Sequence, residues 1–155
     1  MSQSPKDQRQ DSQGPFWRRK SLAEMTEAEW ESLCDGCGKC CVHKVRHANG
    51  RVSVTEVACR LLDLESCRCG NYERRKRLVP DCVVLTPTTV AEIDWLPATC
   101  AYRLLNEGKD LPDWHPLQTG SSEKMHAARI SVRGRVISER DAGPLPQHIV
   151  KWPGF

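Results

Sequence analysis

The stretch Cys34-Asp35-Gly36-Cys37-Gly38-Lys39-Cys40-Cys41 places four cysteines within eight residues of this 155-residue chain. Two cysteines separated by two residues direct their sulfurs at one metal ion when the backbone between them forms a tight turn. Gly36 and Gly38 supply the backbone freedom that such turns need. The stretch therefore predicts a metal site whose first ligands are cysteine thiolates.

The spacing of the first three cysteines fits zinc and iron equally well. It matches the start of the bacterial iron–sulfur pattern, but the proline-linked fourth cysteine of that pattern is missing, and Cys41 follows Cys40 directly. Because side chains of adjacent residues diverge, both thiols are not expected to bind one tetrahedral ion without strain. We therefore expect one of the two to face a second ion.

Five more cysteines follow the first run. Four of them would complete either two four-thiolate sites or one polynuclear cluster. Cys100 has no cysteine near it in the sequence, and we expect it to be a small buried hydrophobic residue with an inert thiol. Cys67 and Cys69 are one residue apart, which suits either two bridged ions or one ligand beside a bystander. The predicted ligands are Cys34, Cys37, Cys40, Cys41, Cys59, Cys67, Cys69 and Cys82.

Histidines and basic residues are weaker candidates for functional groups. His43 and His47 lie near the cysteines, but we expect them to be exposed on a hairpin rather than to serve as nitrogen ligands. The run Arg74-Arg75-Lys76-Arg77 is expected to be a solvated surface, because Tyr72 is its sole aromatic neighbour for stacking nucleic-acid bases. No phosphate-binding glycine loop, catalytic triad order or paired-carboxylate motif stands out.

The cysteine usage predicts a reducing compartment. Nine cysteines are an odd number, they are clustered, and no secretory signal precedes them, which argues against a disulfide framework. No apolar stretch is long enough to span a bilayer or to form the core of a signal peptide. We therefore expect a cytoplasmic protein without a membrane partner.

Metal ligation is also expected to stabilise the fold. Leu, Ile, Val and Phe together number 31 of 155 residues, which is few for a well-packed core. A structural zinc supplies about 10–16 kcal/mol of apparent binding free energy, against about 2–4 for a disulfide. The formal charge of +3 is too small to predict nucleic-acid binding. Eight thiolates remove eight charges and two divalent ions restore four, so the metal-bound charge would be −1.

The chain is expected to comprise three parts. Residues 1–14 are polar and almost devoid of apolar side chains, which predicts a disordered tail. Residues 15–140 are predicted to form the cysteine-rich metal-binding domain. Residues 141–155 hold Gly143, Pro144, Pro146, Pro153 and Gly154 and are expected to be irregular.

The predicted fold class is α+β: a small irregular domain stapled by metal, with short helices. Capping boxes at Ser21-x-x-Glu24 and Thr26-x-x-Glu29 predict a helix that runs into the first cysteine. Asn49-Gly50 predicts the turn of a hairpin after the cysteine run. Helices are expected at residues 55–64, after Thr86-Pro87 and at residues 99–106. Residues 129–138 are expected to form a strand with a bulge, or a small hairpin.

The cysteine pattern resembles a bacterial family named for a proposed ability to chelate zinc or iron, CxxCxxCC. Its run C-x-x-C-G-x-C-C is matched by Cys34, Cys37, Gly38, Cys40 and Cys41. Its later part is matched by Cys59 with Leu62, Cys69 with Tyr72, and Cys82. Cys67 and Cys100 fall outside the pattern. An adjacent Arg-Pro of the family is absent, since Leu78 and Val79 separate Arg77 from Pro80.

A closer resemblance, over residues 15–133, is to the YcgN-like subgroup of that family. It is carried by these segments: Glu29-Trp30-Glu31-Ser32-Leu33-Cys34, Trp95-Leu96-Pro97, Thr99-Cys100-Ala101-Tyr102-Arg103-Leu104-Leu105, Leu111-Pro112 and Trp114-His115-Pro116-Leu117. The resemblance implies zinc or iron chelation and supplies neither a substrate nor a pathway.

Three classes of function stay open at this point. The first, which we take as the prediction, is a protein that holds zinc or iron and presents a surface to a protein partner or delivers metal. The second is an iron or iron–sulfur enzyme or redox protein acting on another protein, which the resemblance implies for some relatives and which needs an open coordination position. The third and weakest is a nucleic-acid module that uses the basic run at residues 74–77. Whether the chain is an enzyme is left open.

Overall fold

The computed structural model describes residues 14–152, and the statements below concern that part of the chain. Apart from Gly14, the expected tail of residues 1–14 lies outside the described residues. The helices are α2 (Phe16–Arg19), α3 (Glu27–Ser32), α4 (Arg75–Leu78), α5 (Ala101–Asn106), α6 (Pro116–Thr119) and α7 (Glu123–Ala127). The 3-10 helices are η1 (Leu22–Glu24), η2 (Lys39–Cys41), η3 (Thr89–Ala91) and η4 (Leu145–His148). None of these described helices has the length and apolar character needed to cross a membrane.

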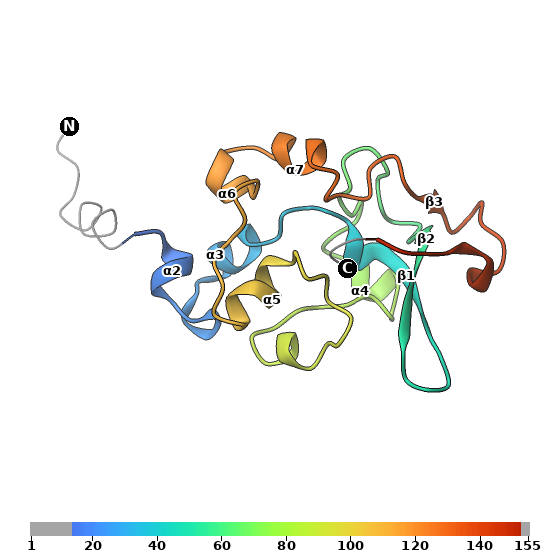
Figure 1. Cartoon of the computed structure of the whole chain (residues 1–155), viewed down its shortest axis with the longest axis horizontal. Helices are drawn as coiled ribbons and strands as arrows, with labels where there is room; N and C mark the ends of the chain where they lie inside the picture. The colour runs from blue at the N-terminus through green and yellow to red at the C-terminus, as the bar shows by residue number, and fades with distance from the viewer. Residues whose placement is uncertain (1–13, 153–155) are drawn as a thin grey trace.

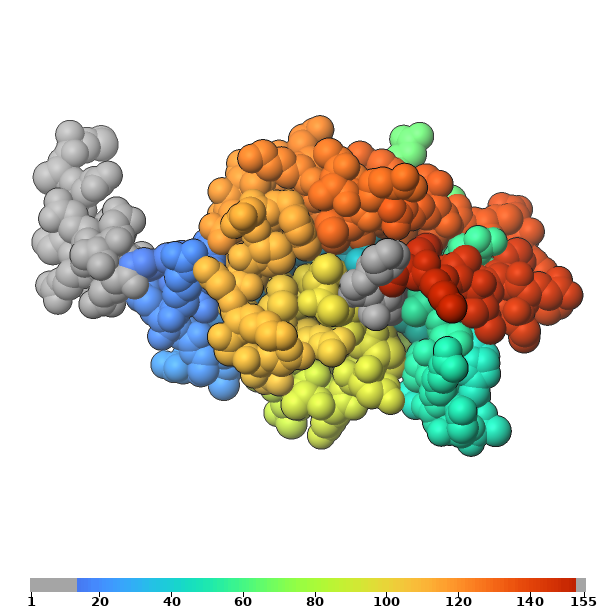
Figure 2. All heavy atoms as spheres, in the orientation of Figure 1, coloured from blue at the N-terminus to red at the C-terminus, as the bar shows by residue number. Residues whose placement is uncertain are grey.

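A small four-stranded sheet completes the α+β fold that the sequence predicts. Its strands are β1 (Val42–Arg46), β2 (Val52–Ala58), β3 (Ile137–Ser138) and β4 (Ile149–Val150). β2 pairs antiparallel with β1 and β4 and parallel with β3. The predicted hairpin is confirmed: Gly50 has φ +85°, His47 N–H donates to the carbonyl of Arg51 at 2.8 Å, and the β1–β2 loop projects from the body of the molecule (Figures 1 and 2).

Two helical segments of the domain follow the sequence signals closely. Thr26 Oγ1 accepts a hydrogen bond from Glu29 N–H at 3.1 Å, and Glu29 Oε1 accepts one from Thr26 N–H at 2.9 Å, so this capping box opens α3 as predicted. The Ser21 capping box opens the separate turn η1, and α3 ends at Ser32, before the first cysteine. The expected helix at residues 99–106 is present as α5, and Gly108 follows it with φ +77°. After Thr86-Pro87 the chain forms the single short turn η3 rather than an α-helix.

Two predicted elements differ from the structure. The helix expected at residues 55–64 is wrong, because β2 continues to Ala58 and the following residues form turns. β-branched residues dominate β2, and pairing with three strands satisfies its backbone, which outweighs the helical spacing of its apolar side chains. In residues 129–138 only β3 is a strand, since Arg129 at φ +61° and Gly134 at φ +76° interrupt the extended backbone. The C-terminal segment, expected to be irregular, contains η4 and β4.

Two hydrophobic clusters lie on either side of the cysteine run. The helical cluster contains Leu33, Val90, Leu96, Ala101, Tyr102 and Leu111. The sheet cluster contains Val42, Ala58, Leu62, Cys67 and Val132. Leu33 precedes the run and Val42 follows it, so residues 34–41 cross from one cluster to the other. Figure 1 shows this segment passing from α3 to β1 through the middle of the molecule.

Candidate metal centre

Hydrogen bonds within the cysteine run bend its backbone into successive tight turns. Asp35 Oδ1 accepts from Cys37 N–H at 2.9 Å, and Cys37 Sγ accepts from Lys39 N–H at 3.5 Å. Cys41 N–H donates to the carbonyl of Gly38 at 3.0 Å. Gly36 and Gly38 both have positive φ, 78° and 79°, as the predicted turns require. An N–H group directed at a thiolate sulfur is a favourable arrangement for a metal ligand.

A buried histidine holds the start of the run, a role that no sequence pattern indicated. His115 is fully buried; its Nδ1 accepts from Leu117 N–H at 3.0 Å, and its Nε2 lies 2.8 Å from the carbonyl oxygen of Leu33. A neutral imidazole with its proton on Nε2 satisfies both contacts. The short segment Trp114-His115-Pro116 could have been found only as an N-cap followed by proline at the first position of α6. His115 thus holds the residue that immediately precedes Cys34.

Cys34 and Cys40 share their surroundings with Cys100. Lys39 Nζ donates to Thr99 Oγ1 at 3.2 Å, which joins the run to the residue before Cys100. Cys34 and Cys40 keep accessible surface, but protein atoms surround both sulfurs closely enough for lost hydration to raise the pKa of each thiol. After burial, the charges of Asp35 and Cys100 raise the pKa of Cys34, to about 11. Burial and then Cys100 likewise raise the pKa of Cys40.

Cys41 lies with three of the distal cysteines instead. Its carbonyl accepts a hydrogen bond from Cys59 N–H at 2.7 Å, at the point where β1 begins and β2 ends. Burial, and then the charges of Cys59, Cys82 and Cys69, raise the pKa of Cys41 to about 12. Burial, Cys59 and Cys69 also raise the pKa of Cys82. The cysteines whose charges raise the pKa of Cys41 most are therefore residues 59, 69 and 82.

Cys67, one of the eight predicted ligands, is placed differently from the rest. It is 3% exposed and packs in the sheet cluster with Val132. After burial, which raises the pKa of its thiol, the largest influences are Ser131 and Arg133, both of which lower it. Its backbone is held at φ +61° in the turn that follows Asp63, whose carbonyl accepts from Cys67 N–H at 2.8 Å. These surroundings are those of a small core residue.

Two lysines and one aspartate place charges beside the thiols. Asp35 is 5% exposed, and its Oδ2 has no hydrogen-bond partner among the described residues. Lys39 is 2% exposed, and burial lowers the pKa of its amine while Cys37 and Asp35 raise it. Lys44 Nζ donates to the carbonyls of Lys39 and Cys40 at 2.8 and 3.2 Å and lies 4.1 Å from the centre of the Trp95 ring. Burial lowers the pKa of Lys44 to about 8. Buried cations beside several sulfurs suit a site in which those sulfurs are thiolates.

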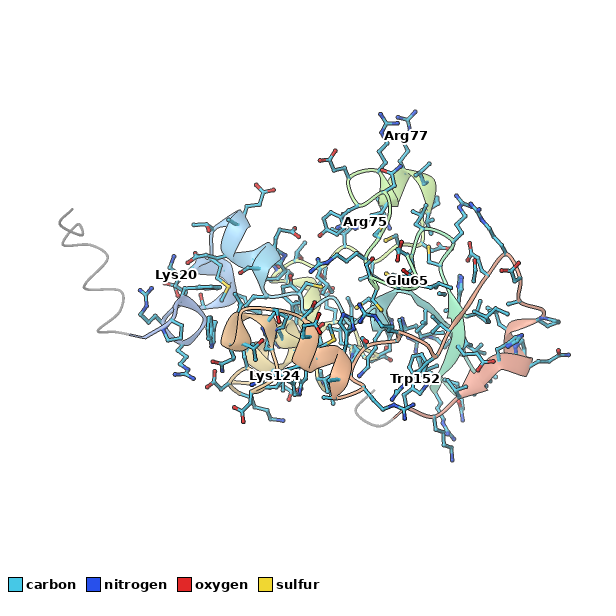
Figure 3. All side chains as sticks on the ribbon, turned by 90° about the horizontal axis from the view of Figure 1, so that it is seen from above. Lys20, Glu65, Arg75, Arg77, Lys124 and Trp152 are labelled. Atoms are coloured by element: carbon cyan, nitrogen blue, oxygen red, sulfur yellow. The ribbon has the colours of Figure 1, made fainter. Side chains whose placement is uncertain are left out.

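The remaining polar candidates are engaged elsewhere. His43 Nε2 contacts a carboxylate oxygen of Glu139, and His47 Nε2 lies 2.7 Å from Ser53 Oγ. In the basic run, Arg75 packs 3.7 Å from the centre of the Tyr72 ring, and Lys76 Nζ donates to the carbonyl of Cys82 at 3.0 Å. Figure 3 shows Arg77 extending away from the ribbon, while Arg75 lies against the molecule.

Comparison with known proteins places these cysteines in a family. A domain family described as "Putative zinc- or iron-chelating domain" (CxxCxxCC) matches residues 33–101, a range that contains all nine cysteines. A UPF0260 protein of Gluconacetobacter diazotrophicus is 64% identical over 141 residues, which cover 90% of this chain and 88% of that protein. The chain belongs to the UPF0260 family. Other UPF0260 proteins, from Rhizorhabdus wittichii and Parvibaculum lavamentivorans, are 58% and 54% identical over 88% and 92% of this chain and 94% and 95% of their own lengths. No solved structure matches this one.

The donor set of this UPF0260 protein fits a thiophilic metal, although the ligands are not preassembled. Among residues 14–152, no three or more His, Cys, Asp or Glu side chains are close enough to hold an ion as they stand. All nine cysteines are nevertheless free thiols, and soft thiolate ligands select zinc, copper(I) and iron–sulfur chemistry. Oδ2 of buried Asp35 also lacks a hydrogen-bond donor among the described residues, as a group near an unfilled polar site would. Metal binding would draw the thiols together and displace their protons.

Proposed function

We propose that this UPF0260 protein is a cytoplasmic metal-binding protein that holds zinc or iron through clustered cysteine thiolates. The observation that carries the proposal is the convergence of distant cysteines on the run at residues 34–41. Lys39 of the run donates to Thr99, the residue before Cys100, at 3.2 Å, and Cys59 N–H donates to the carbonyl of Cys41 at 2.7 Å. The segments of Cys69 and Cys82 are tied to the end of β2 by the Leu62–Cys69 bridge and by the bond from Arg60 to the Leu78 carbonyl. Free cysteines rarely gather in this way in a core without a metal or a redox role.

The thiols explain why a cation would stabilise the structure. Burial raises the pKa of Cys34, Cys37, Cys40 and Cys41, so these groups are protonated near neutral pH when no cation is present. A bound divalent ion supplies the positive charge that stabilises the thiolate forms and links the segments that carry them. Because residues 34–41 lie between the helical cluster and the sheet cluster, ligation there would fasten one to the other.

Cytoplasmic location is part of the proposal, since thiolate ligands must stay reduced. All nine cysteines are unpaired, although several of them lie near one another. In an oxidising compartment such neighbours would be lost to disulfides, whereas cytosolic reductants keep them available to metal. The fold therefore depends on a reducing environment to keep its ligands.

Metal analysis of the full chain, purified without oxygen, tests the proposal together with its absorption spectrum. Colourless protein with bound zinc, or brown protein with charge-transfer bands and bound iron, supports it and identifies the metal. Cys37→Ser and Cys40→Ser are each expected to lower metal content and stability, because a hydroxyl is a poor ligand for these ions. If wild-type protein takes up neither zinc nor iron after anaerobic reconstitution, and a chelator leaves its melting temperature unchanged, the proposed function is wrong.

A further inference from the structure

We infer that the thiols form two separate four-thiolate centres, that Cys100 completes the first of them, and that Cys67 is not a ligand. Centre 1 consists of Cys34, Cys37, Cys40 and Cys100. Centre 2 consists of Cys41, Cys59, Cys69 and Cys82. The inference rests on the proposed function and deepens it, because it assigns the ligands and the number of ions, one tetrahedral divalent ion per centre.

The division begins at the two adjacent cysteines. Cys40 and Cys41 are consecutive residues of η2, and successive side chains of a 3-10 helix point about 120° apart. Cys40 is exposed, whereas Cys41 is half-buried and packs against the sheet cluster. A single tetrahedral ion would need both sulfurs on one side of this turn. The pair therefore serves two centres.

The backbone brings the ligands of centre 2 to Cys41. The Cys59 N–H bond to the Cys41 carbonyl, 2.7 Å, fixes the first of them. Cys69 forms an isolated antiparallel bridge with Leu62, supported by Gly70 N–H donating to the carbonyl of Leu61 at 2.6 Å. The segment of Cys82 is held by Arg60, which follows Cys59 and donates to the carbonyl of Leu78 at 2.7 Å. All three distal segments thus return to the end of β2.

Centre 1 is assembled on the helical cluster. Cys34 follows Leu33, a fully buried member of that cluster, and Cys100 packs against the same cluster at the start of α5. The hydrogen bond from Lys39 Nζ to Thr99 Oγ1, 3.2 Å, closes the gap between the run and α5. A fourth thiolate for Cys34, Cys37 and Cys40 is thereby supplied by a residue 60 positions after Cys40.

Buried charges at each centre are consistent with thiolate ligands. Four thiolates around a divalent ion carry a net charge of −2, which buried cations stabilise. Lys39 is 2% exposed, follows Cys37 by two residues and donates through Nζ to Thr99, the residue before Cys100, at 3.2 Å. Lys44 Nζ donates to the carbonyls of Lys39 and Cys40 at 2.8 and 3.2 Å, so its amine lies beside the turn that carries Cys40 and Cys41.

The assignment reverses two sequence expectations. Cys100 was expected to be an inert buried residue, because it is isolated in the sequence, but α5 packs it beside the run. Cys67 was expected among the ligands because it is close to Cys69, but it packs beside Val132. It is 3% exposed within the sheet cluster. In both cases the distance along the sequence is a poor guide to which cysteine is a ligand, because long-range packing sets the position of the sulfur.

A cobalt(II) titration of the reduced full chain tests the assignment. Tetrathiolate cobalt gives sulfur-to-metal charge-transfer bands whose intensity counts the ions bound, and elemental analysis after zinc loading gives an independent count. Wild-type protein is expected to bind two ions per chain. Cys100→Ser and Cys69→Ser are each expected to bind one, the double variant none, and the control Cys67→Ala two. Circular dichroism of each variant checks that the fold is retained.

The outcomes separate this inference from the proposed function. If wild-type protein binds metal as one ion or one polynuclear cluster, or if Cys100→Ser and Cys69→Ser each remove all of it from folded protein, the two-centre assignment is overturned and metal binding stands. The same follows if Cys67→Ala loses an ion while Cys100→Ser keeps both. If wild-type protein binds no cobalt, zinc or iron, the proposed function itself fails. If a variant unfolds, cadmium-113 NMR of wild-type protein decides, since two tetrathiolate resonances are expected and a single one contradicts the assignment.

Discussion

The backbone N–H of Cys59 donates a 2.7 Å hydrogen bond to the carbonyl oxygen of Cys41. This bond extends the β1–β2 pairing, in which Val42 is opposite Ala58, by one residue beyond the strands. It therefore places the first distal cysteine beside the last cysteine of the run. A seventeen-residue excursion through the hairpin costs little more loop entropy than a shorter one, and a shared metal ion readily offsets it.

Replacing His115 with alanine is expected to destabilise the protein by about 3 kcal/mol, because it opens a cavity and leaves one buried and one half-buried backbone group unpaired. The groups are the Leu33 carbonyl and the Leu117 N–H. Since Leu33 precedes Cys34, weaker metal retention is expected as well. Urea denaturation with and without metal measures both effects. His47→Ala, at an exposed position, is the control and should change stability by less than about 0.5 kcal/mol.

Gly38→Ala is expected to destabilise the fold more than Gly108→Ala does. Both glycines have positive φ, 79° and 77°, so each substitution costs about 1 kcal/mol of backbone strain. At Gly38 the new Cβ would also lie 2.8 Å from Val132 Cγ2, whereas at Gly108 it would meet nothing within 4 Å. Val132 is 1% exposed and has no space to move into. Equal melting temperatures for the two variants would show that the contact between the run and Val132 is loose.

Lys39→Met is expected to weaken metal binding on the order of tenfold, roughly 1.4 kcal/mol, because it removes a buried positive charge beside the thiolates. Competition with a coloured chelator measures the affinity. Lys124→Met removes an exposed lysine of α7, labelled in Figure 3, and should leave the affinity unchanged. An affinity for Lys39→Met equal to that of wild type would mean that the lysine does not act on the metal site.

Removal of residues 1–13 is expected to leave metal content unchanged and the melting temperature within about 1 °C of the full chain, since this segment has almost nothing apolar to bury. The described domain begins at Gly14, whose carbonyl accepts from Arg19 Nε at 2.9 Å. Differential scanning calorimetry of both forms provides the comparison. A fall of several degrees would instead show that the segment packs on the domain.

The sequence by itself determined the features that depend on neighbouring residues. The spacing of Cys34, Cys37 and Cys40 predicts thiolate metal ligands, and the turns at Gly36 and Gly38 are present with positive φ. The Thr26 capping box and the Asn49-Gly50 turn are likewise local, since each is stabilised by bonds within a few residues. Local hydrogen bonds and backbone freedom can be predicted from short sequence patterns, and these turns and caps were predicted in that way.

Only the tertiary structure decided which distant segments lie beside the cysteine run. Helical spacing at residues 55–64 gave way to β2 because three strands pair with it, and this moved Cys59 from a helix to the end of a strand. Cys100 lies near the run because α5 packs on the helical cluster, whereas Cys67 packs in the sheet cluster. These positions arise from contacts between residues far apart in the chain, and the spacing of cysteines carries no information about such contacts.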